Sequence, residues 1–176
     1  MSATAQADIK ALIKDVPDFP KKGIVFKDIT PLLADPAGFR KVIDGLAAPF
    51  MGKGITVVAG IESRGFLLAT PVAYRLGAGV VPIRKKGKLP RATHKVTYSL
   101  EYGEDAIEAH ADALGPKDKV LLIDDVLATG GTAKAACELI DKLGGTLAGV
   151  CFLIELGFLK GREKLPGRRI HSLVTY

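Results

Sequence analysis

Short apolar runs alternate with longer amphipathic stretches along most of this 176-residue chain. A short continuous apolar run is typical of a strand buried in a parallel sheet, whereas an apolar period of 3.6 residues predicts a helix. We therefore expect strands at Ile55–Ala59, Val80–Arg84, Lys119–Ile123, Leu147–Glu155 and, at an edge, His171–Tyr176. Helices are expected at Gln6–Lys14, Asp35–Pro49, Phe66–Leu76 and Thr132–Leu143. This alternation predicts an α/β fold, with a central, mostly parallel sheet flanked by helices on both faces.

Two stretches interrupt the alternation. Residues 16–31 are rich in proline and glycine but also apolar, so we expect them to fold onto the rest of the chain without regular structure of their own. Residues 95–108 alternate with a period of two, which predicts an exposed hairpin. We predict a single domain over residues 1–176, divided into an N-terminal part at 1–34 and a core at 35–176, with a flexible flap at about 85–108.

The most informative segment is VLLIDDVLATGGT, residues 120–132. A buried strand leads to two adjacent carboxylates, Asp124 and Asp125, and a glycine-bearing turn then opens a helix. Free backbone N–H groups and the positive end of a helix dipole meet at such a turn, which favours a bound phosphate. The turn residues are therefore candidate phosphate ligands.

The acidic pair narrows the class of ligand. Carboxylates beside a phosphate repel it, so their presence indicates a second ligand group that they bind. A ribose diol, which donates hydrogen bonds to carboxylates, and a Mg²⁺ ion are both suitable groups. The turn is not a Walker A motif, because no Gly-x-x-x-x-Gly-Lys-Ser/Thr occurs, and it is not the Gly-x-Gly-x-x-Gly of dinucleotide-binding folds.

Two other loops should meet this segment, because ligands bind outside the carboxyl ends of parallel strands. Residues 60–65 carry Arg64, whose planar guanidinium suits phosphate oxygens. Residues 84–91 form a basic run in which Arg84 and Lys88 are the better candidates for a second anion clamp. His94, beside the flap, could reach a phosphate when the flap closes.

Charge and cysteine content restrict the partners. The net charge of +6 makes nucleic acid a partner to consider, but the basic residues cluster in short loops, so we expect small anionic substrates and no nucleic acid. The two cysteines read as core thiols, which suits a reducing cytoplasm. The sequence has no signal-peptide pattern and no apolar stretch that would span a bilayer, so we expect a cytoplasmic protein without a membrane partner.

Over essentially its whole length the chain resembles the adenine phosphoribosyltransferases, which are type I phosphoribosyltransferases that use phosphoribosyl pyrophosphate (PRPP). Besides residues 120–132, the resemblance is carried by FPKKGIVFKDI (19–29), SRGF (63–66), RKKGKLP (84–90), YSLEYG (98–103) and LKGREKL (159–165). It implies the reaction of adenine with PRPP to give AMP and pyrophosphate. It also implies a homodimer, and Mg²⁺ held mainly through PRPP with Asp124 or Asp125 as additional ligands.

The resemblance also implies roles for individual residues. Asp124 and Asp125 would hold the ribose hydroxyls, while Arg64 and Lys88 would stabilise the departing pyrophosphate. The bond between Glu62 and Ser63, in the pyrophosphate loop, would be cis. The turn that wraps the 5′-phosphate would consist of Ala128, Thr129, Gly130, Gly131 and Thr132.

In this family the N-terminal part is a hood over the base. Phe26 would stack on adenine, and the backbone of Val25 and Lys27 would read its edge. Lys27 stands where the family often has arginine, and we expect little change because the backbone does the reading. The flap would exclude water from an oxocarbenium-like centre, and its Glu101 and Tyr102 would be catalytic residues together with Arg64.

Two alternatives remain open from the sequence. The same fold could act on a 6-oxopurine, because base choice depends on the hood. The chain could also be a PRPP-sensing regulator without catalysis, although the Glu101 flap argues against this.

Overall fold

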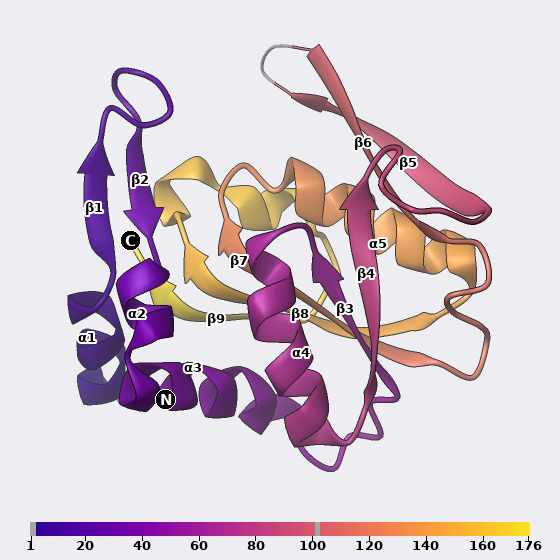
Figure 1. Cartoon of the computed structure of the whole chain (residues 1–176), viewed down its shortest axis with the longest axis horizontal. Helices are drawn as coiled ribbons and strands as arrows, with labels where there is room; N and C mark the ends of the chain where they lie inside the picture. Colours follow the sequence, from indigo (N-terminus) through magenta and orange to yellow (C-terminus); the bar gives the residue numbers. More distant parts are fainter. Residues whose placement is uncertain (1–2, 101–102) are drawn as a thin grey trace.

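A seven-stranded sheet forms the centre of the computed structural model, which describes residues 3–100 and 103–176 (Figure 1). The strand order is β5-β6-β4-β3-β7-β8-β9. Strands β4, β3, β7, β8 and β9 are parallel, and β5 and β6 join them as an antiparallel hairpin. Their bounds are β3 Val57–Ile61, β4 Gly79–Lys85, β5 Thr93–Leu100, β6 Gly103–His110, β7 Lys119–Leu127, β8 Thr146–Glu155 and β9 Ile170–Thr175. The predicted α/β architecture with a mostly parallel sheet is confirmed, as is β9 at an edge.

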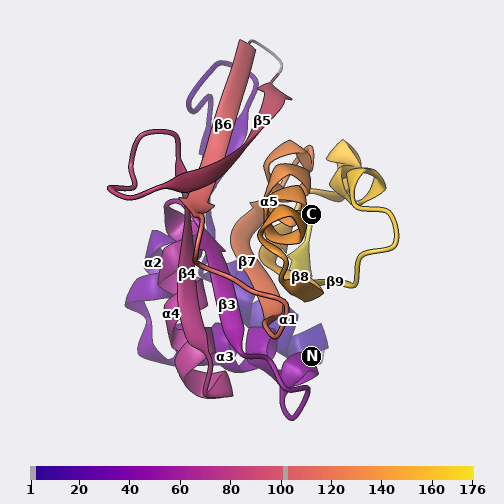
Figure 2. The same cartoon turned by 90° about the vertical axis from the view of Figure 1, so that its right-hand side faces the viewer.

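Helices cover both faces of this sheet (Figure 2). Helices α3 (Pro36–Ala47) and α4 (Arg64–Leu76) pack on one face, with α1 (Ala3–Ala11) beside α3, and α5 (Gly131–Leu143) packs on the other. Each face buries its own apolar cluster. Asp35, where the sequence predicts the start of this helix, caps α3 and accepts a hydrogen bond from the Gly38 N–H at 2.6 Å. None of the described helices combines the length and apolar character needed to cross a membrane.

The N-terminal predictions need correction. Helix α1 ends at Ala11 instead of reaching Lys14. Residues 16–31 do have regular structure, because β1 (Lys14–Pro17) and β2 (Val25–Asp28) form a separate antiparallel hairpin and α2 (Thr30–Ala34) follows it. These strands have four residues each and their side chains are mostly exposed, so they lack the apolar pattern that reveals a buried strand.

Two elements of the central sheet extend further than predicted. Strand β7 continues through Asp124 and Asp125 to Leu127, because it stays paired with β8 as far as Glu155. The flap is continuous with the sheet, because β6 pairs with β4 through Arg84 and Glu108. The acidic pair therefore sits within a central strand, and the flap extends from the edge of the sheet. Beyond β8 the chain forms two short 3₁₀ helices, η2 (Gly157–Leu159) and η3 (Gly161–Lys164).

Candidate active site

A cleft of about 590 Å³ opens at the carboxyl ends of β3, β4 and β7. The predicted site residues that line it are Phe26, Glu62, Ser63, Arg64, Asp124, Asp125 and Thr132. They come from the hood, from the loop after β3, from β7 and from the start of α5. The structure thus confirms that loops far apart in the sequence share one crevice at this edge of the sheet.

The acidic pair lies at the base of the cleft. The Asp125 N–H donates to Asp124 Oδ1 at 2.9 Å, and Arg64 Nη2 lies 2.7 Å from Asp125 Oδ2. Burial, and then the charge of Asp125, raise the pKa of Asp124 well above its ordinary value. Burial also raises the pKa of Asp125, although the Arg64 charge opposes this shift.

The acidic pair has unused capacity to accept hydrogen bonds. Among the described residues, no donor forms a hydrogen bond of good geometry with Asp125 Oδ2, even though Arg64 is close. Arg64 supplies a positive charge to this oxygen but no hydrogen bond, so the oxygen can still accept one from a hydroxyl group of a ligand.

The turn at residues 128–132 is fixed by a close backbone contact. Gly130 has φ +80°, and a Cβ atom there would lie 2.4 Å from the Gly161 oxygen. A Cβ atom at Gly161 would in turn lie 2.3 Å from the Ala128 oxygen. Arg162 fastens the same segment to β8 by two hydrogen bonds to Glu155, at 2.5 and 2.7 Å. The segment 159–165 therefore buttresses the turn.

Only part of this turn faces the cleft. Thr132 lines the cleft, while Gly131 lines a smaller neighbouring pocket of about 320 Å³. Ala128, Thr129 and Gly130 are not among the lining residues of either pocket. The start of α5 is nevertheless directed at the cleft through Thr132.

The loop after β3 is joined to the basic loop by a carboxylate. The peptide bond between Glu62 and Ser63 is cis, as the resemblance implies. The Glu62 carboxylate accepts hydrogen bonds from Arg84 Nε and Nη2, both at 3.2 Å, and from the Lys85 N–H at 3.0 Å. These hydrogen bonds lower the pKa of Glu62.

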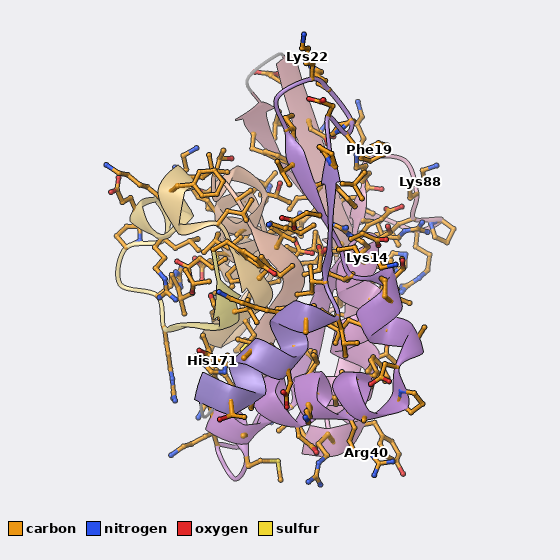
Figure 3. The ribbon with its side chains drawn as sticks, turned by 90° about the vertical axis from the view of Figure 1, so that its left-hand side faces the viewer. Lys14, Phe19, Lys22, Arg40, Lys88 and His171 are labelled. Atoms are coloured by element: carbon orange, nitrogen blue, oxygen red, sulfur yellow. The ribbon has the colours of Figure 1, made fainter. Side chains whose placement is uncertain are left out.

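Arg84 and Lys88 do not line the cleft. The Arg84 guanidinium is engaged by Glu62 and also donates to the Lys88 oxygen at 3.2 Å. Figure 3 shows Lys88 on a separate loop that stands away from the body of the sheet. Arg84 thus fixes the start and middle of the basic loop.

The hood brings an aromatic ring to the cleft. Phe26 lines it, and the Arg64 guanidinium carbon lies 4.6 Å from the centre of the Phe26 ring. Phe19 meets the same ring edge-on, with the ring centres 5.2 Å apart. Val25 is exposed, and neither Val25 nor Lys27 lines the cleft with its side chain.

The flap contributes residues that the sequence analysis did not select. Tyr98 and Asp105 are cross-strand partners, and the Tyr98 hydroxyl donates to Asp105 Oδ2 at 3.3 Å. Lys85 Nζ lies 3.6 Å from the same oxygen, and all three side chains line the cleft. The period-two pattern of residues 95–108 could have revealed the pair once the register of β5 and β6 was known.

The remaining flap candidates do not extend this picture. His94 lies on β5 opposite Ala109 and does not line the cleft. Glu101 and Tyr102 lie outside the described residues.

Known proteins resemble this chain in both sequence and fold. The family described as "Phosphoribosyl transferase domain" matches residues 29–169. The adenine phosphoribosyltransferase of Nitrosococcus oceani is 55% identical over 168 residues, which cover 96% of this chain and 98% of that protein. The chain belongs to the adenine phosphoribosyltransferase family.

Solved structures of this family have the same fold. The adenine phosphoribosyltransferase of Rhodothermus marinus is 51% identical and aligns with a TM-score of 0.96 over 99% of this chain and 100% of that chain. The enzyme of Saccharomyces cerevisiae, solved in complex with adenine and an imino-altritol bisphosphate, is 40% identical, with a TM-score of 0.92 over 98% and 99% of the two chains. This adenine phosphoribosyltransferase family member thus has the type I phosphoribosyltransferase fold.

A divalent cation has few protein ligands available in this phosphoribosyltransferase. Among residues 3–100 and 103–176, no three His, Cys, Asp or Glu side chains gather as a metal-binding group. Asp124 and Asp125 offer carboxylate oxygens in the cleft. Mg²⁺ usually takes one or two carboxylates and completes its shell with water and substrate phosphates, so the acidic pair fits an ion held mainly by a ligand.

Proposed function

We propose that this protein is a purine salvage enzyme that transfers the 5-phosphoribosyl group from PRPP to adenine, giving AMP and pyrophosphate. The observation that carries the proposal is the convergence of Phe26, Arg64, the acidic pair and Thr132 on one cleft. The aromatic ring of Phe26 suits the base, and the Arg64 cation suits pyrophosphate. The paired acceptors Asp124 and Asp125 suit the ribose hydroxyls, and the helix N-terminus at Thr132 suits the 5′-phosphate.

PRPP would bind along β7 and the start of α5. The two ribose hydroxyls would donate to Asp124 and Asp125, which relieves the buried acceptor at Asp125 Oδ2. The 5′-phosphate would sit at residues 128–132, where the backbone N–H groups and the dipole of the 13-residue helix α5 favour an anion.

Pyrophosphate would bind across the loops after β3 and β4. Arg64 and Ser63 line this part of the cleft, and Lys85 adds a further positive charge there. Arg84 would act through its contacts with Glu62 and the Lys88 oxygen, which set the path of the basic loop. Lys88 and His94 would reach the pyrophosphate only through movement of that loop and of the flap.

Adenine would stack on Phe26, with the backbone of Val25 and Lys27 reading its Watson–Crick edge. The Arg64 guanidinium now lies beside the same ring. Base binding and pyrophosphate binding would therefore meet at Arg64, which contacts Phe26 and Asp125 together.

In the reaction, adenine N9 bonds to the anomeric carbon while the bond from that carbon to the pyrophosphate oxygen breaks. The electron pair leaves with pyrophosphate, and the N9 proton passes to a base. Preset cations such as Arg64 stabilise the developing charge, and Mg²⁺, held through PRPP and the acidic pair, would neutralise the phosphate oxygens. We assign proton transfer or base orientation to Glu101, with Tyr102 beside it in the flap.

The test is pyrophosphate release with PRPP and Mg²⁺, with adenine, hypoxanthine, guanine or no base supplied in parallel. We expect pyrophosphate release in the assay that contains adenine and in none of the other three. Turnover with an oxopurine would overturn the assignment of the base, because a 6-oxo group presents an acceptor where adenine presents a donor. PRPP binding without turnover on any base would instead identify a regulator.

We further propose a homodimer in the cytoplasm. Its support is a set of apolar side chains left exposed on α4 and β4, where Leu67 is 53%, Tyr74 90% and Val80 44% exposed. Both cysteines are buried and unpaired, which suits a reducing compartment. We expect light scattering at micromolar concentration to give twice the monomer mass and Tyr74→Glu to reduce it; a wild-type monomer would refute the dimer.

A further inference from the structure

The β1–β2 hairpin of the hood is anchored in the main apolar cluster only at its two ends, by Ile13 before β1 and Ile29 after β2. Strands β1 and β2 form their own two-stranded sheet, apart from the seven-stranded sheet. All four side chains of β1 are exposed. An isolated two-stranded hairpin is marginally stable in water, so the position of the hood depends on the side chains that join it to the rest of the molecule.

One of these side chains is Lys27, which lies on the ring of Tyr176. Its Nζ atom is 3.9 Å from the ring centre and 2.6 Å from Asp15 Oδ1, the carboxylate of its cross-strand partner. Only 11% of the Lys27 side chain is exposed. An ammonium group held over an aromatic face in this way is stabilised by the negative charge of that face.

Tyr176 is itself firmly placed by the body. Its backbone N–H donates to the backbone carbonyl of Glu155, and its backbone carbonyl accepts a hydrogen bond from the Gly157 N–H, both at 3.0 Å. Lys10 of α1 also approaches the ring, at 4.7 Å, and donates to the Thr175 oxygen at 2.7 Å. Figure 1 shows this end of the chain beside β2 and α1. The Tyr176 ring therefore joins β9, α1 and the hood.

Strand geometry links this anchor to the base site. Successive side chains of a strand point to opposite faces, so Phe26 and Lys27 face in opposite directions. Phe26 lines the cleft and Lys27 lies on Tyr176. A shift at Lys27 is thus passed directly to the neighbouring ring that would stack on adenine.

We propose that Tyr176 is a positioning residue for the adenine site. By holding Lys27 it fixes the height and direction of β2, and so places Phe26 and the backbone of Val25 and Lys27 over the cleft. This inference rests on the proposed function of the hood. It also explains how arginine could replace Lys27, because either cation can lie on the ring.

The experiment is a double-mutant cycle read in steady-state kinetics. Tyr176→Leu and Lys27→Met, singly and together, are compared with the wild type for KM of adenine, KM of PRPP and kcat. We expect each single change to raise KM for adenine about three- to tenfold, which is the range of a cation–π contact, with KM for PRPP changed less than about twofold. The effect of the double variant should fall clearly short of the sum of the two single effects, because both changes remove the contact between Lys27 and Tyr176, although Lys27→Met also removes the ion pair with Asp15.

Matched variants separate positioning from general damage. Tyr176→Phe keeps the ring and should restore a KM for adenine close to that of the wild type. Phe158→Leu is the control for loss of an aromatic ring, because Phe158 is 72% exposed on the neighbouring segment.

Three outcomes would overturn the inference. They are an unchanged KM for adenine in both single variants, an equal rise of KM for adenine and for PRPP, and additive effects on KM for adenine in the double variant. If Tyr176→Leu fails to fold, Lys27→Met decides alone. Failure of the proposed function would be distinct, because the wild-type protein would then show no turnover with adenine at all.

Discussion

The contact between Gly161 and the phosphate turn allows a quantitative test of the site. A Cβ atom at Gly161 would lie 2.3 Å from the Ala128 oxygen and 3.0 Å from Leu127 Cδ1. Cβ atoms essentially never approach another heavy atom within 3.0 Å, so in Gly161→Ala the Ala128 oxygen must retreat by about 0.7 Å. The φ of Gly161 lies outside the left-handed region, so alanine acts through this contact and not through backbone strain.

The retreat should appear as weaker use of PRPP. Misplacing a binding group by about 1 Å can cost on the order of 100-fold in rate, so we expect Gly161→Ala to lower kcat/KM for PRPP by about 10- to 100-fold. Overpacking should also lower the free energy of unfolding by about 1–3 kcal/mol. Steady-state kinetics at saturating adenine and urea unfolding measure the two effects. KM for adenine at saturating PRPP should change by less than about twofold, because Phe26 belongs to the separate two-stranded sheet and not to the segment that this contact displaces.

Gly157→Ala is the matched control. Gly157 lies in the same segment, but a Cβ atom there would have its nearest contacts at 3.4 Å, which is ordinary packing distance. If a folded Gly161→Ala protein keeps the wild-type kcat/KM for PRPP, the turn at residues 128–132 does not depend on this buttress and our account of the phosphate site is wrong.

Three further predictions concern single side chains. Asp124→Asn should raise the free energy of unfolding at pH 8, because it removes a buried charge beside Asp125, while raising KM for PRPP. Because burial raises the pKa of Asp124 in the folded protein, its charge opposes folding at high pH. The stability gained by Asp124→Asn should therefore shrink in urea unfolding as the pH falls towards the ordinary aspartate pKa. A stability gain that is constant with pH would contradict this. Glu108→Ala removes the acceptor of the Gly87 N–H at 2.9 Å and should raise KM for pyrophosphate about 5- to 20-fold in the reverse reaction, with the exposed Glu104→Ala as control. Phe26→Ala should raise KM for adenine at least about fivefold in pyrophosphate-release assays with KM for PRPP nearly constant, and an unaltered KM for adenine would remove the stacking role.

The parts of the site that were predictable from the sequence are local ones. Residues 120–132 contain a strand, two carboxylates, a turn and a helix in direct succession, so their chemistry can be read without knowing the tertiary structure. The same holds for the helix that begins after Asp35, whose side chain caps it, and for the helix after residues 60–65, which starts at Arg64, two residues before its predicted start. The fold class followed from alternating apolar runs, which report burial directly.

The parts that could not be predicted depend on contacts between distant residues. Glu62 and Arg84 are 22 positions apart, and nothing in either loop indicates that the carboxylate engages the guanidinium. Tyr98 and Asp105 meet only after the hairpin register is known. The hood hairpin was missed because its strands are short, β1 is exposed and β2 is only partly buried, so that contacts such as Lys27 with Tyr176 hold it and not a buried apolar face.

The separation of the two sheets has a consequence for changing the protein by design. Phe26 and its neighbours belong to the two-stranded sheet, while Arg64, the acidic pair and Thr132 are carried by the seven-stranded sheet and its helices. Residues 14–28 could therefore be exchanged or randomised as a module, provided that Lys27 and its contact with the Tyr176 ring are kept. Libraries confined to that module would sample new acceptor bases on an unchanged phosphoribosyl donor site.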